Sequence, residues 1–389
     1  MSRIKLEKKM LKSRSQQDKD AYREVCNNYS MSLKNAKQRY YSDLIEECGG
    51  DTRKLFQVVR SLFNKPEENQ LPPHDDPRKL ADDFGEFLCR KVDLIRNDID
   101  AITVVPPVLN VPTPEKEFEK FDVLSEEEVS DIIMGSSNAS CQLDPIPTWL
   151  LKLCGSELVP VITKMINLSL QQGQVPDSWK AALIRPLLKK LGLELVYKNF
   201  RPVSNLPMVS KSAEKAVVCQ LFWHCSDNAP LPVHQSSYRQ FHSTETALRK
   251  VQSDILSNMD KQEVTLLVLL DLSAAFDTVD HNILINILES DFGICGDVLK
   301  WFRSYLTRRV QRVIVNQQSS KTFNLNYGVP QGSCLGPVLF LLYASRLFEV
   351  VKKHLPSVHG YADDTQSTCR FVQIRLLLKI KRLRLLRTA

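Results

Sequence analysis

Residues 360–368 read "GYADDTQST" and place two carboxylates, Asp363 and Asp364, side by side among small and polar neighbours. The pattern predicts two short strands joined by a tight turn. Adjacent carboxylates repel each other, and a divalent cation bound at the turn relieves that repulsion. Mg²⁺ suits such a pair, since it prefers one or two carboxylates together with the phosphate oxygens of a substrate. Asp-Asp turns are common, however, and this pair by itself is more often a solvated turn.

A further carboxylate, Asp271, follows the apolar run "VTLLVLL" at 264–270. The run predicts a central, buried strand. A carboxylate at the end of such a strand needs solvent, a hydrogen-bond donor or a cation, because burying a lone charge is very costly. Asp271 could instead cap a helix that begins at Ser273. The choice between these two interpretations depends on the other motifs.

The third motif, "YGVPQGSCLGPVLF" at 327–340, is a glycine-containing loop that runs into an apolar helix. Its glycines allow the backbone to approach a nucleotide closely, and Gln331 is available as a hydrogen-bond donor. An ordinary strand-to-helix loop explains the same composition equally well.

The composition is that of a globular protein. The 389 residues predict two or three domains, and the 43% hydrophobic and 25% charged content excludes a disordered chain. Lys and Arg outnumber Asp and Glu by 52 to 45, a mild preference for a polyanionic partner. The ten cysteines show no CxxC spacing, which predicts reduced thiols and a nuclear or cytoplasmic location. We expect neither secretion nor membrane contact, because the chain has no apolar run of membrane-spanning length and no signal peptide.

Helical patterns dominate the first third of the chain. Residues 1–48 predict one or two long exposed helices, and residues 78–99 predict an amphipathic helix. The proline-rich stretch "VVPPVLNVPTP" at 104–114 predicts a domain boundary. Ser125 and Glu128 form a capping-box pattern. Beyond residue 264 strands alternate with helices, which favours an α+β sheet domain.

The three motifs, taken in order, resemble three successive palm motifs of reverse transcriptases from LINE-type (non-LTR) retrotransposons. The segments that carry the resemblance are "LLDLSAAFDTVDH" (269–281), "YGVPQGSCLGPVLFLLY" (327–343) and "GYADDTQ" (360–366). Further upstream, residues 181–190 ("AALIRPLLKK") and 198–217 resemble the fingers motifs, and residues 234–255 ("HQSSYRQFHSTETALRKVQSDI") resemble the approach to the palm. The resemblance covers about residues 1–368.

The resemblance implies an α+β, right-hand polymerase fold with fingers and a palm of antiparallel strands backed by helices. Residues 1–115 would be the helical connector that these elements carry between endonuclease and polymerase domains. Residues 116–263 would form the fingers and the approach to the palm, and residues 264–370 the palm. Residues 371–389 form a basic tail that we interpret as a frameshifted or alternatively spliced ending. A basic segment that binds nucleic acid or an anionic membrane surface is the alternative.

The resemblance also implies the metal site. It makes Asp271 and Asp363 ligands of two catalytic Mg²⁺ ions and Asp364 the supporting third carboxylate. Two such ions activate an attacking hydroxyl and stabilise the departing oxygen in a phosphoryl transfer. Tyr361 would support the hairpin and face the primer end.

Four further residues match substrate-binding positions of the family. Phe276 matches the aromatic gate that excludes a ribose 2′-OH, although it could equally be a core residue. Gln331 matches the residue that lies against the incoming nucleotide. Arg201 and Lys189 match fingers positions that hold the triphosphate, and a solvated basic surface is the alternative for both.

The chain departs from the family pattern at several positions. Family members usually have Gly where this chain has Phe241, Asn-Asp where it has Ser345-Arg346, and Pro where it has Leu191. We also expect the chain to lack the endonuclease domain and the thumb, and therefore to be weakly active or inactive by itself.

The sequence therefore predicts a truncated RNA-directed DNA polymerase that uses an RNA template, a DNA primer and deoxynucleoside triphosphates. Two alternatives stay open. One is a catalytically dead remnant that binds RNA or DNA, and the other is an interaction protein whose N-terminal helices bind a partner.

Overall fold

The structure is a computed structural model of the 389-residue chain. It describes residues 9–13, 15–49, 54–55, 71–102, 114–190, 192–228, 234–239, 241–272, 274–354 and 357–371. The chain divides into two compact units, Met1–Gln70 and Leu71–Ala389. The predicted linker at 104–114, except Pro114, and the tail from residue 372 onward lie outside the described residues.

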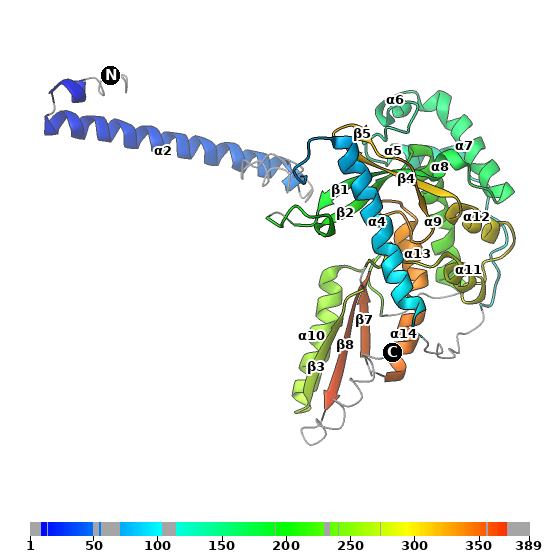
Figure 1. Ribbon diagram of the computed structural model, residues 1–389. Coiled ribbons are helices and arrows are strands. Elements are labelled where there is room, and N and C mark those ends of the chain that lie inside the picture. Colours follow the sequence, from blue (N-terminus) through cyan, green and yellow to red (C-terminus); the bar gives the residue numbers. More distant parts are fainter. Residues whose placement is uncertain are drawn as a thin grey trace. The chain divides into compact units, whose positions relative to one another are not determined.

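The first unit is dominated by one long helix, α2 (Gln16–Glu47), as the sequence predicted (Figure 1). It begins at Ser15, whose side chain accepts a hydrogen bond from the Asp18 backbone N–H and so caps the first turn. Its described side chains are exposed or half-buried, because its apolar residues do not gather on one face.

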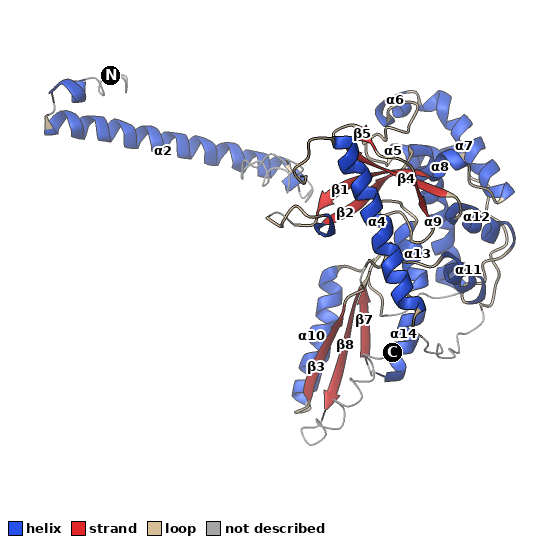
Figure 2. Ribbon diagram, in the orientation of Figure 1, coloured by secondary structure: helices blue, strands red, loops and turns tan. Residues whose placement is uncertain are grey.

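The second unit contains the sheets (Figure 2). Its helices are α4 (Pro77–Asp100), α5 (Glu126–Met134), α6 (Thr148–Leu153), α7 (Gly155–Gln172), α8 (Asp177–Lys180), α9 (Met208–Asn228), α10 (Thr244–Asp260), α11 (His281–Ser290), α12 (Gly296–Leu306), α13 (Gly336–Tyr343) and α14 (Ser345–His354). Its strands are β1 (Ala181–Leu188), β2 (Phe200–Asn205), β3 (Val264–Leu270), β4 (Arg309–Val315), β5 (Gln318–Ser319), β6 (Phe323–Leu325), β7 (Ser357–Tyr361) and β8 (Asp364–Phe371). A short 3-10 helix, Tyr197–Asn199, precedes β2.

A mixed five-stranded sheet has the order β2-β1-β4-β5, with β6 also paired to β4. The pair β1–β4 is parallel, and the other pairs are antiparallel. Helix α4 packs on this sheet through a small core that includes Leu80, Phe84, Ile184 and Val313. The predicted domain boundary near residue 115 is therefore too late: α4 belongs with the sheet, because its apolar face is buried there, and the chain divides after Gln70.

A separate antiparallel sheet has the order β3-β8-β7. Helix α10 runs along it in Figure 1. The prediction that residues 264–270 form a central, buried strand is wrong. Among the described strands β3 pairs with β8 alone, so it lies at the edge, and Leu267 and Leu269 are exposed. The strand is apolar along its length, yet β8, which is rich in Thr, Ser and Gln, is the central strand, since it pairs with β3 on one side and with β7 on the other.

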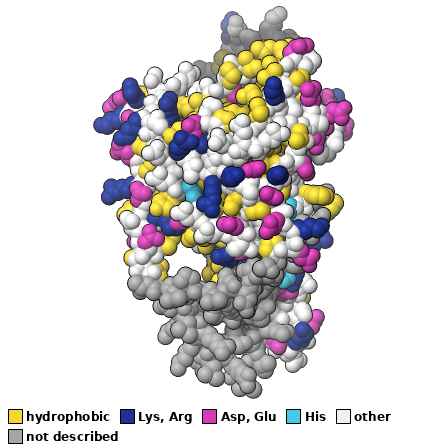
Figure 3. All heavy atoms as spheres, turned by 90° about the vertical axis from the view of Figure 1, so that its right-hand side faces the viewer, with side chains coloured by type: hydrophobic (Ala, Val, Ile, Leu, Met, Phe, Trp, Pro, Cys, Tyr) yellow, Lys and Arg dark blue, Asp and Glu magenta, His cyan; other side chains and the backbone are white. Residues whose placement is uncertain are grey.

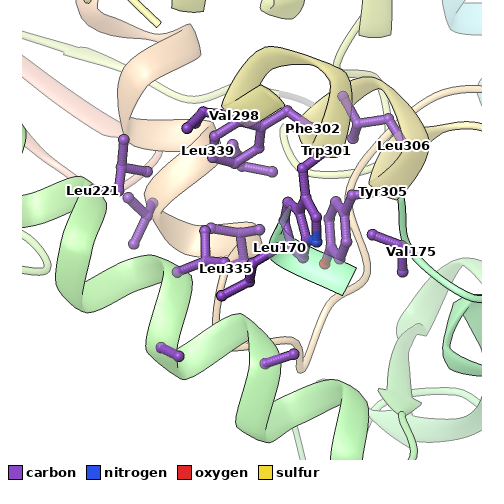
Figure 4. Packing of buried hydrophobic residues seen from close by; sticks show 14 of the residues in the cluster. Leu170, Val175, Leu221, Val298, Trp301, Phe302, Tyr305, Leu306, Leu335 and Leu339 are labelled. Carbon is purple, nitrogen blue, oxygen red and sulfur yellow. The ribbon is translucent and has the colours of Figure 1, made fainter. Parts of the chain in front are cut away.

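The main core lies among α5, α7, α9, α11, α12 and α13. Figure 4 shows its aromatic centre, where the Trp301 ring stacks on Tyr305 at 5.4 Å between centroids. Leu335 and Leu339 of the α13 region pack in the same cluster and are fully buried. The apolar motif after Gln331 thus places its helix in the centre of the core.

Several local predictions are confirmed. The class is α+β, with mixed and antiparallel sheets and helices. Ser125 and Glu128 form a capping box on α5, and β7 and β8 flank a turn as expected. Within the part of the chain that the structure describes, no helix combines the length and apolar character that crossing a membrane requires.

Two departures from the family pattern have structural consequences. Phe241 has a backbone φ of 63° and an 89% exposed side chain, so this chain places a bulky residue where backbone geometry favours Gly. Arg346 donates two hydrogen bonds of 2.7 Å to the carboxylate of Asp291, whose side chain is 5% exposed. The third departure, Leu191, lies outside the described residues.

Candidate functional site

The three predicted catalytic carboxylates lie at one end of the three-stranded sheet. In the β3–β8 ladder Leu270 pairs with Thr365, so Asp271 follows β3 at the end where β8 begins with Asp364. Tyr361 pairs with Asp364 across the hairpin, and Ala362 and Asp363 form its two-residue turn. Neighbouring strands lie about 5 Å apart, which brings Asp271 beside the acidic turn. Asp271 and Asp364 are exposed, and Asp363 is half-buried.

These carboxylates fit a divalent cation by donor type and by strand position. Mg²⁺ takes oxygen ligands and is usually held by one or two carboxylates rather than by a complete protein cage. Within the described residues, no three His, Cys, Asp or Glu side chains gather closely enough to form a metal site by themselves. The three carboxylates therefore share an edge of the sheet but do not converge on one point.

The acidic turn has a strained backbone. Ala362 has a φ of 57°, a left-handed conformation that costs a residue with a Cβ roughly 1–3 kcal/mol. The buried side-chain amide of Gln235 contacts this residue on both sides: its Oε1 accepts from the Ala362 N–H at 3.2 Å, and its Nε2 donates to the Ala362 carbonyl at 3.3 Å. Burial, with some contribution from the charge of Asp363, raises the pKa of nearby Tyr238.

Gln331 lies in a loop that packs against the segment after Asp271. Its Nε2 donates to Oδ1 of Asp277 at 2.6 Å, and its backbone carbonyl accepts from the Ser204 N–H at 2.6 Å. Gly328 has a φ of 81°, and a Cβ there would lie 2.6 Å from the Asp277 carbonyl oxygen. The loop thus joins β2 of the five-stranded sheet to the segment that follows β3.

A basic cluster lies near this loop. The Nζ of Lys189 donates to the Lys198 carbonyl at 2.8 Å. Burial, helped by the positive charges of Lys91 and Arg201, lowers the Lys189 pKa. Arg201 is exposed on β2, opposite Leu187 of β1 in the ladder.

Burial raises the pKa of the Asp277 carboxyl, while the Gln331 hydrogen bond and the charges of Lys91 and Lys189 oppose that shift. The carboxylate and the two lysines therefore interact electrostatically. Lys91 comes from α4, far from the fingers-like motifs in the sequence.

Phe276 is half-buried, and its ring stacks on Phe340 of α13 at 4.7 Å between centroids. This contact is the one expected of a core residue, the alternative that the sequence left open. The ring also keeps a solvent-accessible part. Its role as a steric gate stays a prediction.

The predicted residues therefore form two groups. Asp271, Tyr361, Asp363 and Asp364 lie at the end of the three-stranded sheet, and Gln331, Lys189 and Arg201 lie around the five-stranded sheet. Phe276 and Asp277 lie in the loop that follows Asp271. Asp277 connects the two groups, because its carboxylate accepts a hydrogen bond from Gln331.

Sequence reasoning missed three residues of these surroundings: Gln235, Asp277 and Lys91. Asp277 and Gln235 lie inside quoted motifs, but neither belongs to a periodic pattern, and a single Gln in a polar loop gives no signal of burial. Lys91 is one of many basic residues on a helix, so only the packing of α4 against the sheet identifies it.

The chain was compared with models of known protein families. A family model described as "Reverse transcriptase (RNA-dependent DNA polymerase)" matches residues 188–382, about half of the 389-residue chain. The matched range extends past Thr368 to residue 382. The interpretation of residues 371–389 as a frameshifted or alternatively spliced tail stays a prediction.

Three relatives come from flies. "Probable RNA-directed DNA polymerase from transposon X-element" of Drosophila melanogaster is 27% identical over 266 residues, 68% of this chain and 28% of the relative. "Probable RNA-directed DNA polymerase from transposon BS" of the same species is 29% identical over 57% of this chain and 25% of the relative. "RNA-directed DNA polymerase from mobile element jockey" of Drosophila funebris is 23% identical over 89% of this chain and 39% of the relative. The chain thus spans between about a quarter and two-fifths of the length of these relatives.

Proposed function

The chain belongs to the reverse transcriptase (RNA-dependent DNA polymerase) family, and we propose that it adds deoxynucleotides to the 3′-OH of a DNA primer paired with an RNA template. The observation that carries the proposal is the strand ladder, in which the end of β3 with Asp271 meets the turn with Asp363 and Asp364. Carboxylates on adjacent strands at one edge are what a nucleotidyl transferase needs to hold divalent cations. In this proposal the three-stranded sheet belongs to the palm and the five-stranded sheet to the fingers.

Asp271 and Asp363 would hold two Mg²⁺ ions, with Asp364 in support. When bound, such ions supply activation of the attacking hydroxyl and neutralisation of charge on the transferred phosphate. The protein's own contribution is to place Asp271 and Asp364 at the same end of two paired strands, with Asp363 in the adjoining turn. Tyr361, which pairs with Asp364 in the ladder, would face the primer end.

The triphosphate would lie toward Lys189 and Arg201, because the positive charge of Lys189 is repelled by those of Lys91 and Arg201, with Asp277 as a weaker counter-charge. A phosphate group relieves that repulsion, and its contacts weaken as salt rises. Gln331, held through its backbone by Ser204, would lie against the nucleotide after releasing Asp277. Phe276 would limit the space at the ribose 2′ position.

Primer extension on an RNA template with Mg²⁺ tests the proposal. Asp363→Asn keeps the size of the side chain but removes its charge, so incorporation should fall at least about 100-fold. The matched control is Asp260→Asn, which changes an exposed carboxylate at the C-terminal end of α10, before β3 begins. Equal activity of the Asp363 variant and the wild type would show that this turn does not hold the catalytic metal.

A second candidate function is nucleic-acid binding without catalysis, favoured by the cluster of Lys91, Lys189 and Arg201. It predicts salt-sensitive binding of RNA or DNA that Lys189→Ala weakens, together with no incorporation under any metal condition.

For location, we propose the nucleus or cytoplasm, because the nine cysteines whose side chains the structure describes are free thiols.

A further inference from the structure

Residues 234–236 lie beside the acidic hairpin and form an isolated β-bridge with β7. The Gly360 N–H donates to the His234 carbonyl at 2.9 Å, and the Ser236 N–H donates to the Gly360 carbonyl at 2.9 Å. These two bonds make a parallel bridge between Gln235 and Gly360, outside the named strands. The bridge ends two residues before Ala362, on the side of β7 that faces away from β8.

The Gln235 side chain extends this contact to the turn itself. Its Oε1 accepts from the Ala362 N–H and its Nε2 donates to the Ala362 carbonyl, so one amide satisfies both peptide groups of the turn's first residue. Oε1 also accepts from the Ser237 N–H at 3.1 Å, which fixes the amide within its own segment. Gln235 is 1% exposed, so water does not compete for these bonds.

Gly360 makes this close approach possible. A Cβ at that position would lie 3.1 Å from Nε2 of Gln235 and 2.5 Å from the Phe348 ring. The hairpin therefore packs closely against both the Phe348 ring and the Gln235 amide at Gly360.

Ala362 needs such support because its left-handed backbone is unfavourable for a residue with a Cβ. Strained backbone persists only where its surroundings over-determine it. Two paired strands fix the ends of the turn, but the Gln235 amide is the group among the described residues seen to bond both its N–H and its carbonyl. Asp363 follows directly, so the amide also determines where that carboxylate points.

We propose that Gln235 is a positioning residue for nucleotide transfer, which holds the strained Ala362 turn so that Asp363 is presented to the catalytic metal. This inference rests on the proposed function. Gln235 touches neither substrate nor metal and acts through the Ala362 backbone. Its loss should lower the rate of the chemical step and leave nucleotide binding, which relies on the other group of residues, nearly unchanged.

Single-nucleotide primer extension by the full chain separates kcat from KM. Gln235→Ala should lower kcat by about 10-fold to 100-fold with a KM for the nucleotide within about twofold of wild type, because small misplacement of a catalytic group costs rates of that order. Gln235→Glu keeps the acceptor for the Ala362 N–H but loses the donor to its carbonyl, so it should recover part of the rate. Ser236→Ala is the matched control: it removes the 3.1 Å contact between Ser236 Oγ and His359 Nε2, one residue away, and should leave kcat unchanged.

A second variant tests the strain directly. Ala362→Gly adopts a φ of 57° freely, so Gln235→Ala should cost less kcat in that background than in the wild type. Equal losses in the two backgrounds, or a kcat for Gln235→Ala that matches the Ser236→Ala control, would overturn the proposal.

Hydrogen exchange keeps the inference testable if the wild-type chain extends no primer, a result that would count against the proposed function. The Ala362 amide should then exchange at least about 10-fold faster in Gln235→Ala than in Ser236→Ala, because its acceptor is gone. Unchanged exchange at Ala362 overturns the positioning role whether or not the chain is active.

Discussion

The two loops of the candidate site are held in different ways. The Gln331 loop is built into the main core: the Glu214 carboxylate accepts from the backbone N–H groups of Cys334 at 2.7 Å and Leu335 at 3.4 Å, where α13 begins. The Asp363 turn belongs to a thin sheet whose buried cluster contains three residues, Phe348, Val351 and Val358. It depends on one side chain, Gln235, rather than on a large core.

Because of this difference, substitutions in the Gln331 loop should lower the stability of the unit, whereas substitutions at the Asp363 turn should alter the position of the Asp363 carboxylate. A loop anchored in the core opens only when much of the unit unfolds, so its variants should lose global stability. A turn on a small, edge-exposed sheet can shift locally, so its variants should lose activity at little cost in stability.

The largest effect is expected for Glu214→Leu. Glu214 is 1% exposed, and it also accepts a 2.9 Å hydrogen bond from the Tyr305 hydroxyl. The substitution leaves these buried donors unsatisfied and removes a negative charge near the buried Arg309 guanidinium. The free energy of unfolding should fall by about 3–5 kcal/mol, measured by urea denaturation.

Glu245→Leu provides the control, because Glu245 is an exposed residue of α10 that pairs with Arg249. It should change stability by less than about 0.5 kcal/mol. The loss of stability for Gln235→Ala should fall between the two, at about 1–2 kcal/mol. If Gln235→Ala proved as destabilising as Glu214→Leu, the Asp363 turn would contribute to global stability as much as the Gln331 loop does.

A smaller effect of the same residue depends on pH. Burial raises the Glu214 pKa above its ordinary 4.5, against the opposing charge of Arg309. A raised folded-state pKa gives stability that is fully present below pH 4.5 and is lost as pH rises through the folded value. Wild type should therefore gain stability relative to Glu214→Gln as pH falls from the alkaline range toward 4.5. A difference between the two proteins that is constant over this range would mean that Glu214 titrates normally.

The sequence predicted the parts of the molecule that depend on local pattern. The turn between β7 and β8, the capping box of α5 and the buried helix after Gln331 each follow from short-range spacing or composition. The adjacent carboxylates attracted notice because they repel each other, and the structure places them with Asp271 at one end of the three-stranded sheet, while their role as metal ligands stays a prediction.

The misses share a different cause, which is tertiary context. Hydrophobicity placed β3 at the centre of its sheet, but β8 is the central strand, since it pairs with β3 on one side and with β7 on the other. Likewise, α4 was grouped with the N-terminal helices because its partners, Ile184 and Val313, lie more than ninety residues further along the chain. The role of Gln235 depends on a contact with Ala362 that spans 127 residues.

Gly332→Ala tests the core-anchored loop without touching a charge. Gly332 has a φ of 122°, and a Cβ there would lie 2.5 Å from the Ser204 carbonyl oxygen. Strain and clash together should cost about 1–3 kcal/mol of stability. Gly192→Ala is a matched control, since Gly192 has a φ of 84° with open space around it and so reports the backbone strain alone. Equal losses for the two variants would show that the Gln331 loop yields readily at Ser204.

The smallest effect is expected for Phe241→Gly, in the segment that supports the Asp363 turn. The His242 N–H donates to the Arg239 carbonyl at 3.3 Å and closes a turn with Phe241 at its third position. Glycine relieves the strain of a φ of 63°, but it also gives the unfolded chain more freedom, so the net gain should be only about 0.5–1 kcal/mol.

Phe241→Ala separates backbone from side chain, because it removes the exposed ring and keeps the strained φ. Thermal unfolding of both variants should show a higher melting temperature for the Gly variant alone. If the Ala variant were stabilised equally, the exposed ring rather than the backbone would be the source of the instability. If neither variant changed, the strain at Phe241 would already be compensated within the turn, and this segment would hold the Asp363 turn more rigidly than its small core implies.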